Sequence, residues 1–558
     1  MRPHPAARPA IATIPAGPLA TLLAAAWLLA AAALLAGCST PPPTPRAPLK
    51  LTILHTNDHH GRFWTNNDGE GGLAARKTLI DSVRAEVAAA GGHTLLLDGG
   101  DVNTGVPESD LQEAEPDFKG MALLGYDAMA VGNHEFDNPP AVLAKQRAWI
   151  NFPMLSANIY QDGKRLFEPY RIFERAGHKI AVIGLTTDDT AKMVLPDNIT
   201  GIQFRKPIAE AAVLVPQLRG LADMLIAVTH MGHYPDGQRG VNAPGDVEMA
   251  RAVAGLDLVV GGHSQNPVCM AAENQRNNDY LPGAPCAPDR QNGTWIVQAH
   301  EWGKYVGRAD FVIEAGQVTL QRYQLLPVNQ KLRDAEGRKR VTYTTPIAED
   351  PAMRSFLAPF QAVGQGNLSV PVGLVDGVLD GDRVRVRQQP TNLGTLIARA
   401  MMDKTGADLA LINSGGVRDS MPAGPLTYRD VLKVQPFGNT VGVVTLTGAE
   451  LLDFLRAAAA MTPGSGGFPQ TAGLQMRIDG NVLREARVAG AAIDPARRYQ
   501  LAINNFTALG GDGYPKLKSH PGYVDSGFND AQVLRGFMAA RSPLKVADFE
   551  PGDAVQRR

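Results

Sequence analysis

The sequence has almost no net charge, which limits its partners. Lysine and arginine number 54 and aspartate and glutamate number 55, so the formal charge is −1 at pH 7. A protein that binds a nucleic-acid polymer through bulk electrostatics needs an excess of positive charge, and this chain has none. Any anion must be held by a local site. Charged residues make up 20% of the chain and hydrophobic residues 44%, which excludes wholesale disorder.

The amino terminus has the pattern of an export signal. Arg2 and Arg8 precede an apolar run at residues 19–36, and Leu35-Ala36-Gly37-Cys38 closes this run. The pattern resembles the lipobox of a bacterial lipoprotein, which predicts a signal peptide at residues 1–37 and a lipid on Cys38. The alternative is an uncleaved membrane anchor, since 18 mostly apolar residues could just span a bilayer.

The segment that follows Cys38 is rich in proline. Residues 38–48 are therefore predicted to be an extended tether that holds the first domain off a membrane surface. Ser39 resembles the residue at this position in lipoproteins that are sorted to the outer membrane. We expect a cell-envelope protein in the periplasm, lipid-anchored to a membrane, with the outer membrane favoured.

Cysteine is scarce, at three residues. With Cys38 assigned to the lipid, Cys269 and Cys286 remain, and they are separated by 17 residues. An exported compartment is oxidising, so these two are expected to form a disulfide that closes a polar loop at residues 271–283. The alternative is two free buried thiols.

The length of 558 residues predicts two or three domains, and no internal repeat is evident. Residues 49–345 alternate short apolar runs with amphipathic stretches such as Leu73–Val87. This alternation predicts an α/β layered domain. The strand candidates are Leu51–Leu54, Thr94–Leu97, Ala128–Val131, Ile180–Ile183, Met224–Val228 and Leu256–Val260.

Residues 346–366 are expected to form a connector helix that can serve as a hinge. Asp350 is the predicted N-cap, Pro351 the first helical residue, and Pro359 is expected to kink or shorten the helix. A smaller mixed domain is predicted at residues 367–550, followed by a tail at 551–558. Its expected helices include residues 392–402 and one that opens at Leu451 after the capping box of Thr447–Glu450.

Five short segments place metal-ligand residues directly after strand candidates. Loops beyond the carboxyl ends of strands in α/β sheets share one edge, so these segments are expected to converge. Carboxylate and imidazole ligands, with one carboxylate shared between two ions, suit metal-assisted phosphate ester hydrolysis. The candidates are Asp58, His60, Asp101, Asn133, His134, Asp137, His230, His263 and Gln265. His59, His233 and His300 are left outside this set, with His233 and His300 read as supporting partners or surface groups, and Asp98 is expected to cap or hydrogen-bond locally.

The second domain carries residues that could select a substrate. Arg383 and Arg387, four residues apart, could hold a carboxylate or phosphate, and Arg418 follows a glycine turn. The alternative for this arginine-rich segment is a strand with a solvated face. Phe437 and Phe506 stand in loop-like runs and could sandwich a base; the alternative is ordinary loop packing.

In this order the five ligand segments, together with residues 104–110, are similar to those of the 5'-nucleotidase family. The resemblance extends over residues 49–533 and implies a four-layer α/β/β/α metallophosphatase domain followed by a smaller mixed α/β substrate-binding domain. It implies that Asp58, His60, Asp101 and Gln265 hold one divalent metal ion, while Asp101, Asn133, His230 and His263 hold another. His134 and Asp137 correspond to a catalytic dyad, and Cys269–Cys286 to a disulfide. Phe437 and Phe506 would stack the base, Asn439 and Asp512 would hydrogen-bond base or ribose, and Arg383, Arg387 and Arg418 would bind substrate.

The resemblance implies an exported 5'-nucleotidase that also cleaves UDP-sugars to UMP and sugar 1-phosphate. The metal could be zinc, manganese, cobalt or magnesium. One alternative is the related 2',3'-cyclic phosphodiesterase/3'-nucleotidase. Asp137 and Pro107–Asp110 favour the 5'-nucleotidase over this alternative. A nucleotide-binding lipoprotein without catalysis is the other alternative. The expected partners are nucleotides, nucleotide sugars and a membrane, with a monomeric chain.

Overall fold

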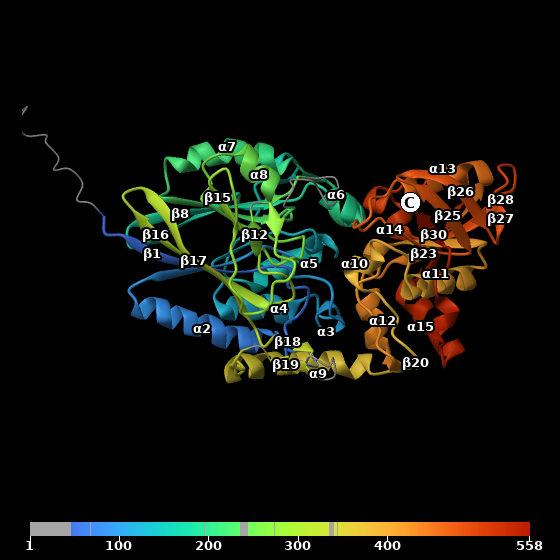
Figure 1. The fold of residues 1–558 in the computed structure, drawn as a ribbon, viewed down its shortest axis with the longest axis horizontal. Helices are drawn as coiled ribbons and strands as arrows, with labels where there is room; N and C mark the ends of the chain where they lie inside the picture. The colour runs from blue at the N-terminus through green and yellow to red at the C-terminus, as the bar shows by residue number, and fades with distance from the viewer. Residues whose placement is uncertain are drawn as a thin grey trace, which may run out of the picture. The chain divides into compact units, whose positions relative to one another are not determined.

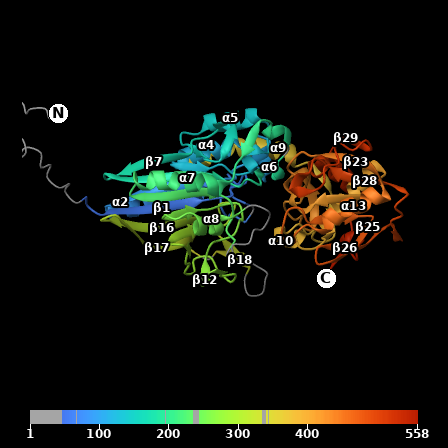
Figure 2. The same ribbon diagram turned by 90° about the horizontal axis from the view of Figure 1, so that it is seen from above.

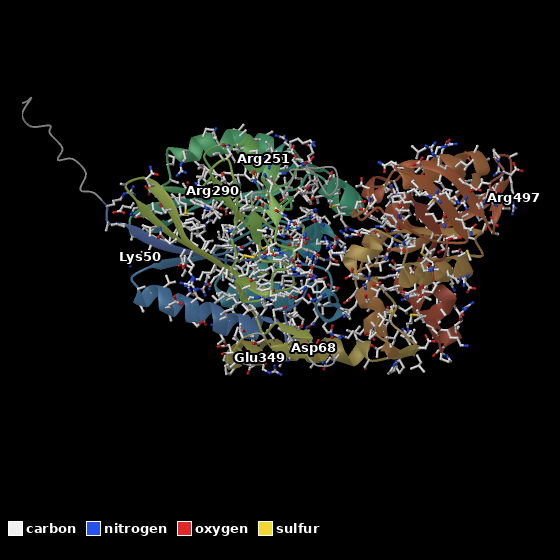
Figure 3. The ribbon with its side chains drawn as sticks, viewed as in Figure 1. Lys50, Asp68, Arg251, Arg290, Glu349 and Arg497 are labelled. Atoms are coloured by element: carbon white, nitrogen blue, oxygen red, sulfur yellow. A yellow bond between two sulfur atoms is a disulfide. The ribbon has the colours of Figure 1, made fainter. Side chains whose placement is uncertain are left out.

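The computed structural model describes residues 46–558 except 67, 195, 235–243, 273, 334–339 and 343 (Figure 1). The predicted signal peptide, Cys38 and most of the predicted tether lie outside the described residues. Within the part of the chain that is described, no helix combines the length and apolar character needed to cross a membrane. Charged side chains such as Lys50, Arg251 and Arg497 lie at the surface (Figure 3).

Two six-stranded sheets form the centre of the first domain. The first sheet has the order β17-β16-β1-β2-β3-β4, with β1 (Leu49–Thr56), β2 (His93–Asp98), β3 (Ala128–Ala130), β4 (Met154–Leu155), β16 (Tyr305–Glu314) and β17 (Gln317–Pro327). The second has the order β14-β15-β11-β10-β8-β7, with β7 (Tyr170–Arg175), β8 (His178–Thr186), β10 (Met224–His230), β11 (Leu258–Val260), β14 (Asp289–Gln291) and β15 (Thr294–Val297). β1 to β4 are parallel, as are β8, β10, β11 and β15.

Helices cover the outer face of each sheet, which gives four layers. Figure 1 shows α2 (Leu73–Ala89) on the outer side of the first sheet and α7 (Pro207–Arg219) with α8 (Asp246–Ala252) on that of the second, and Figure 2 looks down onto α7 and α8. Along β1, Leu51 and Ile53 pack between the sheets, while Leu54 packs towards the helices. A strand covered on both faces reads as a nearly continuous apolar run, which is why the sequence signals these strands. The predicted α/β/β/α order is confirmed.

The remaining elements of the first domain are short or lie at its periphery. The helices are α3 (Pro107–Asp110), α4 (Glu115–Leu124), η1 (His134–Phe136), α5 (Pro140–Trp149), α6 (Thr190–Met193) and η2 (Pro196–Ile199). The strands are β5 (Ile159–Gln161), β6 (Lys164–Arg165), β9 (Ile202–Phe204), β12 (Met270–Ala272), β13 (Gln275–Arg276), β18 (Lys331–Arg333) and β19 (Arg340–Thr342).

The second domain is built on a five-stranded sheet with the order β24-β21-β28-β23-β29. Its strands are β21 (Leu409–Asn413), β23 (Thr440–Thr447), β24 (Pro469–Ala472), β28 (Arg498–Asn504) and β29 (Tyr523–Asn529). The other strands are β20 (Pro371–Val375), β22 (Gly424–Thr427), β25 (Leu474–Asp479), β26 (Val482–Val488), β27 (Ala491–Ala492) and β30 (Val555–Arg557). Its helices are α10 (Arg383–Val386), α11 (Asn392–Thr405), η3 (Ser414–Gly416), α12 (Tyr428–Val434), α13 (Gly448–Ala459), α14 (Asn505–Ala508), η4 (Gly511–Gly513), α15 (Asp530–Arg541) and η5 (Val546–Phe549).

The connector helix differs from its prediction in one respect. Helix α9 (Pro351–Leu368) begins as expected, with the Asp350 side chain accepting a hydrogen bond from the Met353 amide at 2.7 Å. It continues past Pro359 to Leu368, so Pro359 does not shorten it. Met353 and Leu357 are buried against the helical layer of the first domain, and this packing outweighs the cost of an internal proline.

Three further segments differ from expectation. The arginine-rich segment is the short helix α10, capped by the Asp382 side chain, rather than a strand. The capping-box helix α13 starts at Gly448, because Thr447 itself is the N-cap. The segment expected as a tail contributes β30, which pairs in parallel with β25.

Candidate functional site

The predicted metal ligands lie on loops that follow parallel strands of both sheets. Asp58 and Asp101 follow β1 and β2, and Asn133 follows β3. His230 is the last residue of β10, and His263 follows β11. The side chains from these loops meet at one edge of the two sheets, as the sequence predicts.

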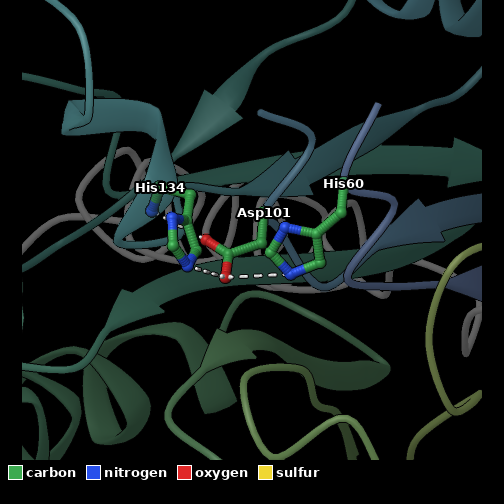
Figure 4. A group of neighbouring side chains, drawn as sticks. All are labelled: His60, Asp101 and His134. Atoms are coloured by element: carbon green, nitrogen blue, oxygen red, sulfur yellow. Dashed lines mark hydrogen bonds and ion pairs between the residues drawn. The ribbon is translucent and has the colours of Figure 1, made fainter. Parts of the chain in front are cut away.

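Asp101 belongs to two groups of metal-ligand atoms. His60 and His134 complete one group, shown in Figure 4, and His230 and His263 complete the other. Oδ2 of Asp101 lies 2.9 Å from Nε2 of His230, 3.8 Å from Nε2 of His60 and 3.9 Å from Nε2 of His134. A carboxylate common to both groups is what two ions with a bridging ligand require.

The donor atoms and their burial fit a pair of cations. Oδ1 of Asp58 is buried and accepts no hydrogen bond from any described residue. Nδ1 of His60 lies 2.8 Å from the Thr104 carbonyl oxygen, and Nδ1 of His230 lies 2.7 Å from that of Gly99. A carbonyl oxygen only accepts, so each Nδ1 carries a hydrogen, and Nε2 is the nitrogen of each ring that faces the site and could bind a cation once deprotonated.

Three other proposed ligands also reach this centre. Nδ1 of His263 lies 3.0 Å from Oδ1 of Asn133 and 3.2 Å from Nε2 of His230. Nε2 of Gln265 lies 2.6 Å from Nε2 of His60, and Oε1 of Gln265 accepts a hydrogen bond from Arg383. The second domain therefore contacts a proposed metal ligand directly.

Glycine at position 132 is required by this close packing. A Cβ atom at Gly132 would lie 2.1 Å from Oδ1 of Asp101 and 2.6 Å from the Asp101 amide. Any side chain here would displace the shared carboxylate. Asp98, in contrast, accepts hydrogen bonds from the Thr56 hydroxyl and the Gly100 amide, which confirms its local role.

His134 is oriented by Asp137. Nδ1 of His134 lies 2.6 Å from Oδ2 of Asp137, and the His134 amide donates to Oδ1 of Asp101 at 2.9 Å. Both residues follow Asn133 in and after the short helix η1. Nε2 of His134 is thereby turned towards the centre.

The carboxylates and imidazoles of the centre perturb one another. Burial alone would lower the pKa of His230, but Asp101 and Asp58 raise it to about 10. Burial and the neighbouring His230 lower the pKa of His263 to about 3. Burial opposes ionisation of Asp101, yet His230 and His134 hold its pKa well below its usual range. The shared carboxylate is therefore ionised, as a bridging ligand must be.

All seven substrate-binding candidates line one cavity of about 800 Å³ together with most of the proposed ligands. They are Arg383, Arg387, Arg418, Phe437, Asn439, Phe506 and Asp512. Burial and the mutual repulsion of the arginines lower the pKa of Arg387, and they lower that of Arg418 to about 10. An anion in the cavity would relieve this repulsion.

The aromatic and polar candidates are held in defined positions. Phe437 stacks on His134, and the Arg418 guanidinium lies 5.4 Å from the centroid of the Phe437 ring. Asn413 donates to Asp512 at 2.7 Å. Phe506 packs against Gly511, where a Cβ atom would lie 2.4 Å from its ring.

Several lining residues were missed by sequence reasoning. Tyr234, Arg62 and Trp302 line the same cavity, and the Arg62 guanidinium lies 4.5 Å from the Trp302 ring centroid. Arg62 follows His60 by two residues, and Trp302 follows His300 by two residues. Their closeness in sequence to histidines already singled out could have predicted that they line the site. His233 is fully buried rather than a surface group, and its Nε2 lies 2.8 Å from Asp289.

The predicted disulfide is present. Cys269 and Cys286 are bonded, with Cα atoms 4.8 Å apart. Cys269 is buried among residues between the two sheets, just beyond the His263–Gln265 segment. The disulfide therefore links the loop that contains Cys286 to Cys269, which lies in the core a few residues after Gln265.

Comparisons with known proteins agree with this geometry. Residues 51–267 match the calcineurin-like phosphoesterase family, and residues 366–519 match the 5'-nucleotidase C-terminal domain. The chain is 56% identical over 515 residues to protein UshA of Escherichia coli strain K12, covering 91% of this chain and 94% of that protein. It is 55% identical over 534 residues to a 5'-nucleotidase of Vibrio cholerae, covering 94% and 97%.

The fold has a solved counterpart. The crystal structure of a 5'-nucleotidase precursor from Thermus thermophilus aligns with a TM-score of 0.75 at 29% identity, covering 91% of this chain and 99% of that one. Both domains are therefore accounted for in the order that the sequence predicts. Since high identity to relatives extends over nearly the whole described chain, this protein belongs to the 5'-nucleotidase family.

Proposed function

We propose that the protein is a dimetal 5'-nucleotidase that hydrolyses nucleoside 5'-phosphates to nucleoside and phosphate. The observation that carries this proposal is one cavity of about 800 Å³, which is lined by Asp101, by most of the other proposed ligands, and by the arginines and phenylalanines of the second domain. A phosphate ester of a nucleoside is the ligand class that needs both sets at once.

The proposed roles follow from the contacts. Asp58, His60, Asp101 and Gln265 would hold one ion, and Asp101, Asn133, His230 and His263 the other. When bound, the two ions supply Lewis-acid activation of water and of the phosphoryl group. His134, held by Asp137, has a raised pKa despite burial because Asp137 and Asp101 favour its protonated form. A protonated imidazole can stabilise the negative charge that develops on the phosphoryl group.

The second domain would bind the nucleoside. Arg383, Arg387 and Arg418 offer positive charge whose mutual repulsion an anionic substrate offsets. Phe437 and Phe506 offer faces for a base, and Asn439 and Asp512 offer hydrogen bonds to base or ribose. A UDP-sugar, like a nucleoside 5'-phosphate, has a base, a ribose and a phosphate on the 5' oxygen. We therefore include cleavage of UDP-sugars to UMP and sugar 1-phosphate in the proposal.

Contacts between the domains support residues 346–366 as a hinge. Arg429 on α12 pairs with the buried Glu108 on α3 at 2.5 Å, and Arg383 donates to Gln265. Substrate must contact both domains, so turnover would require these contacts to open and close. An engineered disulfide that locks the domains apart should abolish turnover while metal binding is kept; unchanged turnover would contradict the hinge.

The remaining features are proposed from the sequence. The physiological metal is zinc, manganese, cobalt or magnesium, because the ligands are oxygen and imidazole donors. The chain is proposed to be an exported monomer of the cell envelope, anchored through a lipid on Cys38. Mass spectrometry of the mature amino terminus would test the anchor.

One substrate panel tests the function. Phosphate release from AMP, 3'-AMP, 2',3'-cyclic AMP and UDP-glucose should be measured with each metal and with a chelator. The proposal expects metal-dependent phosphate release from AMP. It also expects phosphate release from UDP-glucose without added phosphatase, because the UMP that forms is itself a nucleoside 5'-phosphate. Preference for 3'-AMP or the cyclic nucleotide would favour the related phosphodiesterase activity instead.

A further inference from the structure

Two tripeptides of the candidate metal centre share one backbone pattern. In Asp58-His59-His60, φ is +50° at both Asp58 and His60, and in His263-Ser264-Gln265 it is +76° at His263 and +56° at Gln265. In both tripeptides the proposed ligands are the outer residues, and the middle residue does not have a positive φ. Left-handed φ values cost free energy in residues other than glycine, and they persist only where surrounding contacts enforce them.

His59 is fixed by a chain of buried side chains. Nε2 of His59 lies 2.8 Å from Oδ1 of Asp117, and Nη2 of Arg76 lies 3.2 Å from Nδ1 of His59. The other carboxylate oxygen of Asp117 accepts from the Ser109 hydroxyl at 2.6 Å. An arginine can only donate, so Nδ1 accepts, and Nε2 carries the hydrogen that it donates to Asp117. His59, Asp117, Arg76 and Ser109 are each at most 1% exposed.

Ser264 is fixed in the same way between two elements. Its hydroxyl accepts from the His233 amide at 3.1 Å and donates to Oε1 of Gln298 at 3.1 Å. Gln298 is fully buried and donates in turn to the Asn266 carbonyl oxygen at 2.8 Å. Ser264 thus connects the end of β10 to the segment after β15.

The two tripeptides also support each other. The His263 amide donates to Oδ2 of Asp58 at 2.9 Å. The position of one tripeptide therefore sets the direction of a carboxylate in the other. Loss of the side-chain hydrogen bonds of either middle residue would let the flanking residues leave the left-handed region. Proposed ligands of both ions would then move.

We propose that His59 and Ser264 are positioning residues that hold the flanking ligands in a strained, metal-ready conformation. They do not contact the ions themselves. Their hydrogen bonds supply the free energy that keeps Asp58, His60, His263 and Gln265 in left-handed geometry before a cation arrives. The inference rests on the proposed dimetal centre and deepens it.

The test measures metal binding without substrate. Free Mn²⁺ is titrated into chelator-treated wild type, His59→Ala and Ser264→Ala, and bound metal is counted by electron paramagnetic resonance. Each variant should need about 10–100-fold more Mn²⁺ for half-saturation, the range found for residues that orient metal ligands. His59→Gln keeps an acceptor for Arg76 and a donor for Asp117, and Ser264→Thr keeps the hydroxyl, so both should recover most of the affinity.

A matched control separates positioning from general loss of stability. His178 is a buried histidine beside Asp223, at the amino end of β8 and far along the strand from the ligand loops. His178→Ala should lower the thermal midpoint of the chelated protein without changing Mn²⁺ half-saturation. Unchanged half-saturation in both His59→Ala and Ser264→Ala would overturn the proposal. So would failure of both His59→Gln and Ser264→Thr to recover affinity, or the same shift in His178→Ala.

Two outcomes, misfolding of His59→Ala and absence of nucleotide hydrolysis, still leave the positioning roles measurable. If His59→Ala does not fold, Ser264→Ala against Ser264→Thr makes the same comparison by itself. If wild type binds Mn²⁺ but hydrolyses no nucleotide, the proposed function fails while the positioning roles are still measured.

Discussion

The Phe437 ring stacks on the His134 imidazole, with ring centroids 5.9 Å apart and an angle of 11° between the planes. One residue comes from the second domain and the other from the proposed catalytic dyad. The surface proposed to recognise the base therefore adjoins the residue proposed to act on the phosphate.

Phe437→Ala should raise KM for AMP by about 10-fold, because a base stacked on an aromatic ring contributes about 1–3 kcal/mol. Metal content should stay at the wild-type level. Steady-state kinetics and metal analysis check both. Phe528→Ala removes an exposed phenylalanine from β29 and should leave KM unchanged; an equal effect there would contradict a specific role of Phe437.

His134→Ala should lower kcat by about 10²–10⁴-fold while both ions stay bound, since His134 is proposed to act on the phosphoryl group rather than to hold metal. Asp137→Asn should produce a smaller loss of the same kind, because it weakens only the orientation of the ring. Loss of metal from His134→Ala would instead show that His134 binds an ion. Its position beside His60 and Asp101 is compatible with that role.

Removal of metal should abolish turnover and lower thermal stability. Metal that binds only the folded chain at 100 times its Kd stabilises it by about 2.7 kcal/mol. Differential scanning calorimetry with a chelator and with added Mn²⁺ measures this difference. Asp101→Asn should lose affinity for both ions, whereas Asn133→Ala should weaken only one of the two; two unaffected sites in Asp101→Asn would rule out a shared carboxylate.

Asp530 should make the second domain less stable as pH rises. Burial raises the pKa of Asp530 to about 7, although hydrogen bonds from Ala531 and Asn439 oppose this. Between about pH 4 and pH 7 the unfolded chain releases the proton while the folded chain keeps it, so the free energy of unfolding falls with increasing pH.

Asp530→Asn removes this titration. Its thermal midpoint relative to wild type should rise steadily from pH 4 to pH 7, measured on chelated protein. Asp453→Asn, which alters an exposed carboxylate, should show no such trend. If the difference in thermal midpoint between Asp530→Asn and wild type does not change from pH 4 to pH 7, the buried carboxyl does not titrate in this range.

The strands of the first domain were predictable because both of their faces are covered. Leu51–Leu54 and Met224–Val228 lie within β1 and β10, where burial on two sides leaves a continuous apolar run in the sequence. The extent of α9 was not predictable. Its passage through Pro359 depends on contacts with α2 and α4, which are distant along the chain.

The sequence by itself determined which side chains could bind metal and phosphate, because ligand chemistry is a property of residue type and the loops follow recognisable strands. It also determined the disulfide pair. The resemblance to a family implied that Asp101 is shared, and the structure places Asp101 in both ligand groups. Only the tertiary structure decided that Arg383 reaches Gln265 and that His59 and Ser264 are held by buried partners. Those relationships join segments that are far apart in the sequence: 118 residues separate Gln265 from Arg383, and 58 separate His59 from Asp117. Hydrophobic periodicity reports only on neighbouring residues and carries no information about such contacts.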